Sequence, residues 1–470
     1  MSDIKITDIV DFNPKRVVKK GEIAPFVDMA ALPVDSRDIS EIGEREFKGS
    51  GSKFVNGDTL FARITPCLEN GKTAKVSGLP EGVAASGSTE FIVMAAKEPD
   101  YDEDYVYYLA RLPEFRSYAQ ARMEGTSGRQ RVPWQSLVEF EYSFPDKEKR
   151  KEIGAFLKKI DDKIELNRQT NQTLEHIAQA IFKSWFVDFE PTRAKIAAKQ
   201  AGQDPERAAM AAISGKSLAE LDQLSPEQQE ELKATAAQFP DALVDSELGE
   251  IPEGWAAKPF GELLSKTIGG DWGKEEPDEK HTEKVKILRG TDLPNVHAGS
   301  DDRVPTRYVT AKKLATRKLE AGDIVIEVSG GSPTQPTGRS LYLTQEIISR
   351  LNADLEPASF CRLFRPVESE VGLILGLHLQ KIYDEGKTWL YQNTSTGISN
   401  FQTKVFLGKE LVVVPSVELN KHFYDFAMPY LQKMSSNENK TLVELRDALL
   451  PKLLSGDLAI GNEDKEVLHG

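Results

Sequence analysis

The stretch GDTLFARI at residues 57–64 has a counterpart in GDIVIEVS at residues 322–329. Each opens with a Gly-Asp turn signal and continues as a short, largely apolar run, which predicts a β-strand. Four further pairs of stretches match in the same order: PFVDMAALP (25–33) with KILRGTDLP (286–294), TEFIVMAA (89–96) with SFCRLFRP (359–366), GTSGRQRVPWQSL (125–137) with NTSTGISNFQTKV (393–405), and YSFPDKEKRKEI (142–153) with VVVPSVELNKHF (412–423). Five matches in one order predict an internal repeat, so the 470 residues hold two similar domains.

A long helix is predicted to follow the strands of each half. The first runs from about Glu148 to Phe189, and its apolar seam advances in alternating steps of four and three residues, which is the heptad pattern of a coiled coil. The seam comprises Ile153, Leu157, Ile160, Ile164, Asn167, Asn171, Leu174, Ala178, Ile181 and Trp185. The second helix is predicted from about Glu418 to Leu454, with a shift of register after Thr441.

Two arrangements of these helices are open. Each helix packs on its own domain, or the two pair antiparallel as a spacer. In the second arrangement Asn167 and Asn437, near the two midpoints, meet in a polar layer that sets the register.

The expected fold class is α+β, with two similar domains of small mixed β-sheets and helices separated by a long antiparallel two-helix coiled-coil spacer. The segment between the halves is rich in Ala, Gln, Glu and Lys and predicts short helices in a linker. The boundaries are 1–146 for the first domain, 147–190 for the first spacer helix, 191–245 for the linker, 246–416 for the second domain, 417–458 for the second spacer helix and 459–470 for the tail.

Composition favours a cytoplasmic protein. No apolar run approaches the roughly 20 residues that span a bilayer, and the N-terminus has no signal-peptide pattern. The net charge of −14 argues against a chain that coats nucleic acid without specificity, because such binding depends on lysine and arginine. Local basic loops on an acidic body remain compatible with it.

The sequence contains little that indicates an enzyme active site. GGSPTQPTGRS, residues 330–340, lacks the glycine spacing of a phosphate-binding loop, and no histidine stands at metal-ligand spacing with another histidine or a cysteine. Cys67 has neither a counterpart in the second half nor a neighbouring histidine. The sequence therefore predicts no catalytic residue and no metal site in this chain.

Polar loop tips remain as candidate contacts. They lie at matching places in the two halves but carry different side chains, as expected for two readers of different short DNA sequences, although ordinary polar loops give the same pattern. Arg, Asn and Gln contact base edges, whereas Ser and Thr serve bases or phosphates. The candidates are Arg122, Thr126, Ser127, Arg129, Gln130 and Arg131 in the first half, and Asn393, Thr394, Ser395, Thr396, Ser399, Asn400, Gln402 and Lys404 in the second.

A predicted hairpin supplies three further candidates. Gly57-Asp58 and Asn70-Gly71 mark its corners in the first half, as Gly322-Asp323 and Gly338-Arg339 do in the second. The DNA contacts expected here are Arg63, Lys72 and Arg339.

Four stretches resemble the specificity subunit of type I restriction-modification enzymes. They occur in that family's order and extend over nearly the whole chain: GDTLFARITPCLENGKTA (57–74), NRQTNQTLEHIAQAIFKSWFVDFEP (167–191), SELGEIPEGW (246–255) and NKTLVELRDALLPKLLSGDL (439–458).

The resemblance implies two target-recognition domains, each reading one half of a bipartite double-stranded DNA target, and no catalysis by the chain itself. It further implies two methyltransferase subunits and restriction subunits as partners, which use S-adenosylmethionine, ATP and Mg, while this chain binds no cofactor. A recognition subunit of another restriction class with bipartite targets, or a protein-binding repeat protein, are the alternatives.

The aromatic residues near the end of the first helix have two interpretations. Trp185 and Phe186 pack on the chain's own second domain, or they form part of a partner interface, where large aromatic side chains often anchor.

Overall fold

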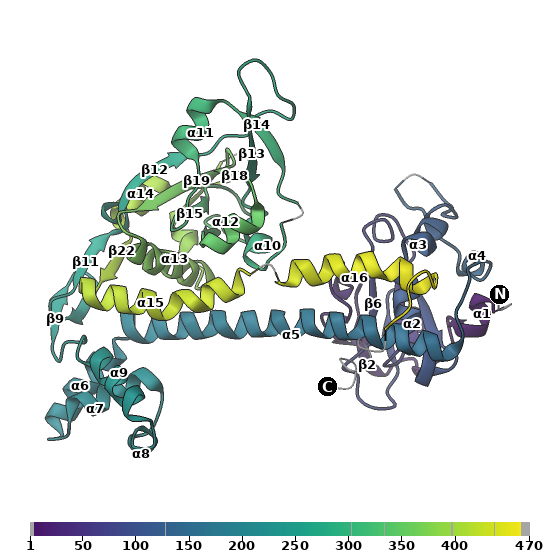
Figure 1. Ribbon diagram of the computed structural model, residues 1–470, viewed down its shortest axis with the longest axis horizontal. Coiled ribbons are helices and arrows are strands. Elements are labelled where there is room, and N and C mark those ends of the chain that lie inside the picture. The colour runs from purple at the N-terminus through teal and green to yellow at the C-terminus, as the bar shows by residue number, and fades with distance from the viewer. Residues whose placement is uncertain are drawn as a thin grey trace. The chain divides into compact units, whose positions relative to one another are not determined.

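The computed structural model describes residues 4–461 except 127, 302, 333, 396–397 and 437. The chain divides into two compact units, which we call unit 1 (Met1–Asn167 with Asn439–Gly470) and unit 2 (Arg168–Glu438). Figure 1 shows the elements of both.

Unit 1 contains two small sheets. The first is antiparallel with strand order β1-β8-β5-β6, and the second has the order β3-β2-β7-β4 with β2 and β7 parallel. The strands are β1 (Val10–Phe12), β2 (Ile23–Val27), β3 (Gly43–Glu46), β4 (Ser52–Phe54), β5 (Thr59–Ala62), β6 (Thr73–Lys75), β7 (Ala85–Gly87) and β8 (Phe91–Ala96), followed by α2 (Pro99–Arg111), α3 (Pro113–Gln120) and α4 (Trp134–Leu137).

Unit 2 repeats this topology, except that its second sheet has three strands and no counterpart of β4. Its antiparallel sheet has the order β12-β19-β15-β17, and its second sheet, β14-β13-β18, again has a parallel pair, β13 with β18. The elements are β12 (Leu264–Gly269), β13 (Glu283–Leu288), β14 (Thr306–Val309), β15 (Ile324–Glu327), β17 (Ser340–Tyr342), β18 (Asp354–Pro357) and β19 (Cys361–Pro366), with α10 (Leu293–His297), α11 (Ala311–Arg317), α12 (Gln345–Leu351), α13 (Ser369–Asp384), α14 (Thr403–Lys409) and β22 (Leu411–Val414). The predicted internal repeat is confirmed.

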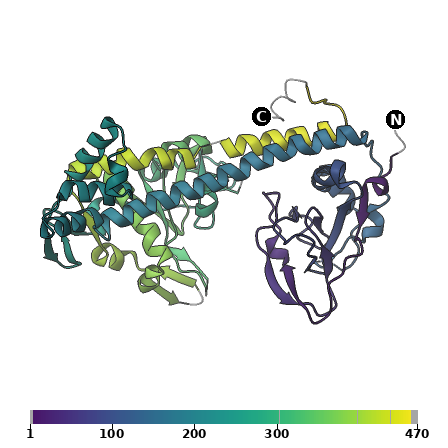
Figure 2. The ribbon, with the colours of Figure 1, turned by 90° about the horizontal axis from the view of Figure 1, so that it is seen from below.

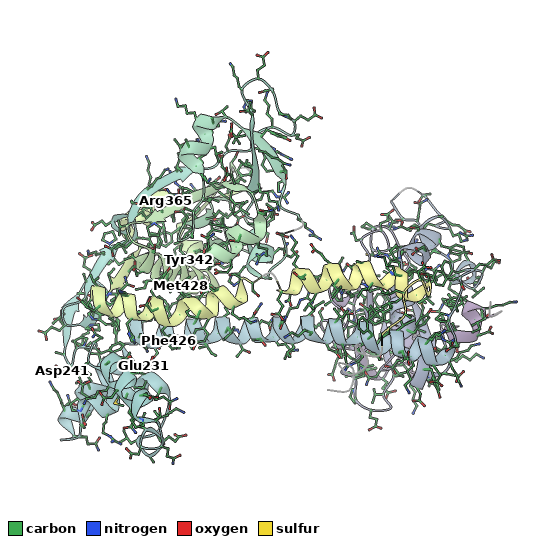
Figure 3. The ribbon with its side chains drawn as sticks, viewed as in Figure 1. Glu231, Asp241, Tyr342, Arg365, Phe426 and Met428 are labelled. Atoms are coloured by element: carbon green, nitrogen blue, oxygen red, sulfur yellow. The ribbon has the colours of Figure 1, made fainter. Side chains whose placement is uncertain are left out.

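The Gly-Asp corners that open β5 and β15 match in detail. Gly57 and Gly322 have φ of +88° and +89°, a backbone conformation that favours glycine. The aspartate that follows each glycine is buried and paired: Asp58 with Arg16, and Asp323 with Arg365, whose position Figure 3 labels. The repeat therefore preserves the turn and its buried aspartate, while the half-buried arginine that pairs with this aspartate comes from a different segment in each half.

Helix α5 (Lys147–Phe186) confirms the predicted first helix, and each of its ten seam residues is buried or half-buried. In unit 1 it lies against α16 (Glu438–Leu454), and in unit 2 against α15 (Val417–Met434) (Figures 1 and 2). The pairing is antiparallel in both units. In unit 1 Asp161 meets Arg446 and Asn167 meets Asn439, and in unit 2 Asn171 meets Met434 and Phe186 meets Phe423.

The prediction of one continuous helix from Glu418 to Leu454 is wrong. Helix α15 ends at Met434, and α16 begins at Glu438. Arg350, buried at the end of α12, donates a hydrogen bond to the carbonyl of Ser435 at 2.8 Å. A helix end needs such a donor for its last carbonyls, so this arginine stabilises the termination of α15.

The linker forms short helices, as predicted: α6 (Glu190–Gln200), α7 (Pro205–Ser214), α8 (Leu218–Leu221) and α9 (Pro226–Ala236). Asp204, Ser217 and Ser225 cap the last three. Phe239, just beyond α9, packs against Trp185 and joins the main core of unit 2. No helix in the described part of the chain is long and apolar enough to cross a membrane.

Candidate functional site

The two candidate loops of unit 1 lie side by side. The loop after β5 and the loop before α4 pair through a bridge between Ile64 and Arg131, and the amide of Thr65 donates to the carbonyl of Gln130 at 3.0 Å. The amide of Val132 donates to the carbonyl of Arg63 at 2.9 Å. Segments more than 60 residues apart in sequence therefore form one surface.

Unit 2 joins the corresponding loops more extensively. Strands β16 (Ser329–Gly330), β21 (Ile398–Phe401) and β20 (Gln392–Ser395) form one antiparallel sheet. Ser329 Oγ donates to Asn400 Oδ1 at 2.9 Å, and Gln392 Oε1 accepts from the amide of Thr337 at 2.9 Å. Ser329 occupies the repeat position of Ile64, so both units bring the same two loops together. We call each combination a loop pair.

Several predicted DNA contacts are already engaged within the chain. Arg131 makes a bidentate ion pair with Glu90, and Arg339 makes one with Glu327, with N–O distances of 2.7–3.0 Å. In both cases the carboxylate raises the pKa of the guanidinium. These arginines anchor the loop pairs, and this role of Arg131 and Arg339 was not predicted from the sequence.

Lys72 and Arg122 are engaged as well. Lys72 Nζ donates to the carbonyl of Met29 at 2.8 Å. The guanidinium of Arg122 lies over the ring of Tyr118, 3.3 Å from its centroid. Lys72 and Arg339, at the matching corners of the two hairpins, are therefore both bound to acceptors within the chain.

The remaining candidates divide by exposure. Thr126 and Arg129 in unit 1, and Asn393, Asn400, Gln402 and Lys404 in unit 2, are exposed, whereas Gln130 and Arg63 are half-buried. Ser399 is buried, and its hydroxyl accepts a hydrogen bond from Gln392. Ser127 and Thr396 lie outside the described residues, and for Thr394 and Ser395 only the backbone is described.

A buried carboxylate stabilises the base of the unit 2 loop pair. Glu410 accepts hydrogen bonds from His378 at 2.7 Å, Lys387 at 2.7 Å and Tyr391 OH at 2.6 Å. Burial raises the pKa of Glu410, but these donors outweigh burial and lower the pKa to about 2. Lys387 and Tyr391 begin and end the short helix η3 (Lys387–Tyr391), which leads directly into β20. Glu410 was missed because its donors lie 19 to 32 residues away.

Comparison with known proteins identifies the family of this chain. Residues 1–176 match the family model described as the type I restriction modification DNA specificity domain. Over 430 residues, covering 88% of this chain and 89% of the relative, the chain is 30% identical to the type I restriction enzyme HindI specificity subunit of Haemophilus influenzae. This chain belongs to the family of type I restriction enzyme specificity subunits.

Two further relatives are less similar to this chain. The specificity subunit shares 22% identity over 370 residues with the MjaIX specificity subunit of Methanocaldococcus jannaschii, covering 76% of this chain and 69% of the relative. A crystal structure of the type I S subunit from M. genitalium aligns with a TM-score of 0.48 at 15% identity, covering 96% of this chain and 95% of that chain.

The partner-interface prediction for Trp185 and Phe186 of the specificity subunit is corrected by the structure. Each side chain is only 3% exposed. Trp185 packs against Phe239 and Phe423, and Phe186 packs against Phe423 and Trp255. Both residues therefore belong to the core of unit 2.

The predicted polar layer of the helix pair is found in part. Asn167 Nδ2 donates to Asn439 Oδ1 at 3.0 Å, while Asn437 lies outside the described residues. Among the described residues of the specificity subunit, no group of three or more His, Cys, Asp or Glu side chains is arranged to hold a metal ion.

Proposed function

We propose that this specificity subunit reads one half of a bipartite double-stranded DNA target with each unit and performs no catalysis itself. The observation that supports this proposal is the repeated loop pair. Both units join the same two loops on the same scaffold, yet the exposed side chains differ, with Thr126 and Arg129 in unit 1 and Asn393, Gln402 and Lys404 in unit 2. A fixed scaffold with changed contact residues suits two readers of different base sequences.

The proposed partners follow from the family. Two methyltransferase subunits dock on this chain and methylate adenine with S-adenosylmethionine, and restriction subunits use ATP and Mg. The chain supplies the DNA sequence preference and binds none of these cofactors. Cytoplasm is the proposed location, since the target is cellular DNA.

Alanine substitution of exposed side chains in one unit tests the proposal that each unit reads one half-site. The exposed residues Asn393 and Gln402 are replaced by alanine in the complex reconstituted with its methyltransferase subunits, and methylated adenines are mapped across a genome. One half of the recognised sequence is expected to change or relax, while the other half stays the same. Glu227→Ala, on the exposed face of linker helix α9, is the control. Equal loss at both half-sites, or no change at either, would refute the assignment.

We further propose that the paired helices set the distance between the half-sites. Insertion of seven residues into α5 and seven into the facing helix, α15 or α16, adds about 10.5 Å at 1.5 Å per residue. At roughly 3.4 Å per base pair, the unread spacer of the target is expected to lengthen by about three base pairs with unchanged half-sites. Altered half-sites at an unchanged spacer would contradict this role.

A further inference from the structure

Unit 1 contains an open cleft with basic walls. The cleft has a volume of about 690 Å³. It lies between the segment that follows β1, strand β4 and the surface of the first sheet, and its lining includes Lys15, Arg16, Lys53, Arg63 and Trp134. No aspartate or glutamate is among its described lining residues, although the whole chain carries a net charge of −14. We call this feature the basic cleft.

Three of the four cations of the basic cleft lack an ionic partner. Within the described part of the chain, Lys15, Lys53 and Arg63 form no ion pair, although Lys53 Nζ lies over the ring of Phe47, 5.0 Å from its centroid, and Arg16 is neutralised by Asp58 at 3.1 Å. The Nε atom of Arg63 is buried without a hydrogen-bond partner. A half-buried guanidinium without an internal acceptor is unfavourable unless a ligand supplies one.

The basic cleft is continuous with the unit 1 loop pair. Arg63 lines the cleft, and its backbone amide and carbonyl bond to Glu90 and Val132 at 2.9 Å each. Glu90 in turn anchors Arg131 of the loop pair. The basic cleft and the loop pair are therefore neighbours that share Arg63.

The distribution of the charges points to an extended ligand. The three cations without an ionic partner, Lys15, Lys53 and Arg63, come from three separate chain segments along one open cleft, which suits a series of anionic groups better than a single small anion. Duplex DNA carries one negative charge per about 1.7 Å of helix axis and offers phosphates in series. We propose that the basic cleft binds the phosphodiester backbone of the DNA beside the half-site read by unit 1.

The repeat makes this contact asymmetric. The position of Arg63 in the first half is occupied by Val328 in the second half, so unit 2 lacks this cation. Unit 1 is therefore expected to contribute more of the salt-dependent affinity for DNA than unit 2, although the two units have similar folds. This inference rests on the proposed DNA-reading function.

Salt dependence tests the proposal in the complex reconstituted with its methyltransferase subunits. The dissociation constant for a duplex carrying the mapped target is measured over a range of NaCl concentrations. Each phosphate contact contributes about 0.9 to the slope of log K against log salt. The Lys15→Ala, Lys53→Ala double variant is expected to reduce this slope by about 1.8, and Arg63→Gln by about 0.9. The methylated sequence should not change, because backbone contacts carry no direct base information.

A matched control removes the same two charges outside the cleft. Lys19→Ala with Lys20→Ala changes two exposed lysines of the same segment, and it should leave the slope unchanged. Melting temperatures establish that all variants are folded. An unchanged slope in the cleft variants, an equal reduction in the control, or a new methylated sequence in Arg63→Gln would overturn the backbone assignment while specific DNA binding by the wild-type complex persists. Failure of the wild-type complex to bind its target would instead overturn the proposed function.

Discussion

Arg446 on α16 donates a hydrogen bond to Asp161 on α5 at 2.6 Å, and the two side chains are only 2% and 4% exposed. Tyr108 OH donates to the other carboxylate oxygen of Asp161 at 2.6 Å, and Asp447 accepts from Arg446 at 2.9 Å. A buried charge pair with its hydrogen bonds satisfied tolerates little displacement. A slip of one residue between α5 and α16 would leave both charges buried and unpaired, so this pair selects the register of the helices in unit 1.

Arg446→Met is expected to destabilise unit 1 by about 3–5 kcal/mol, because it leaves Asp161 as a buried charge without its cation. The double variant Asp161→Leu, Arg446→Met removes both charges and should recover most of the loss, since apolar replacement of a buried pair is often neutral. Chemical denaturation of the full chain measures both effects. Lys158→Ala, which breaks a solvent-exposed pair with Asp162, is the control and should change stability by less than about 1 kcal/mol. A double variant as unstable as the single one would contradict this account.

The heptad seam of α5 could be predicted from the sequence because its apolar residues recur with the same period as the buried positions of the helix. The pair of Asp161 and Arg446, which sets the register, could not be predicted. Asp161 and Arg446 are charged residues on helices, and such residues most often face solvent. Only the positions of both helices reveal that they face each other across 285 residues of sequence. Asn167 was predicted as a register residue because a polar residue in an apolar seam is conspicuous, and its partner is Asn439.

The loop pairs show the same limit at the candidate site. Their places could be predicted, because turn residues recur at matching positions in the two halves. The sequence could not predict which cations are available to DNA. Acceptors such as Glu90 for Arg131 and the Met29 carbonyl for Lys72 come from segments about 40 residues away. The basic cleft was missed for a related reason: Lys15, Lys53 and Arg63 lie on three separate segments and form no motif.

Glu410→Gln is expected to reduce stability at neutral pH and to change the acid dependence of folding. The folded-state pKa is about 2, against an ordinary value of 4.5, so Glu410 stabilises the fold above pH 4.5 and loses this contribution as the pH falls toward 2. A shift of this size corresponds to about 3 kcal/mol. The difference in unfolding free energy between wild type and variant should therefore narrow by about that amount between pH 5 and pH 2. A constant difference would contradict the role of Glu410.

Glu356→Gln should have the opposite pH dependence. Glu356 on β18 is fully buried, and neither of its carboxylate oxygens has a hydrogen-bond partner in the described structure. Burial, reinforced by Asp271, raises its pKa to about 7. The folded state then binds a proton that the unfolded state releases above pH 4.5, so wild-type stability falls as the pH rises from 4.5 to 7.

The neutral amide of Glu356→Gln does not titrate, so stability should shift in favour of the variant by about 3 kcal/mol between pH 5 and pH 8. Denaturant titrations at the two pH values measure this shift. Asp271→Asn provides a second comparison, since it removes the neighbouring charge and should weaken the same pH dependence. Parallel pH profiles for wild type and Glu356→Gln would show that the carboxyl group is ionised in the folded state.

Lys404, in the first turn of α14, and Asn393, on β20 of the unit 2 loop pair, are expected to act on DNA in different ways. Both side chains are exposed, and Lys404 forms no ion pair within the described structure. Lys404→Ala removes a charge that suits a phosphate, so it should weaken binding about equally for all sequences and reduce the salt slope by about 1. Asn393→Ala removes a group suited to an adenine edge, so it should relax one position of a half-site by about 1–3 kcal/mol and leave the slope unchanged. Competition binding against duplexes mutated one base pair at a time separates the two effects. Equal loss across all duplexes for both variants would show that Asn393 reads no base, and unchanged binding in both would remove the exposed edge of this loop pair from the DNA contact.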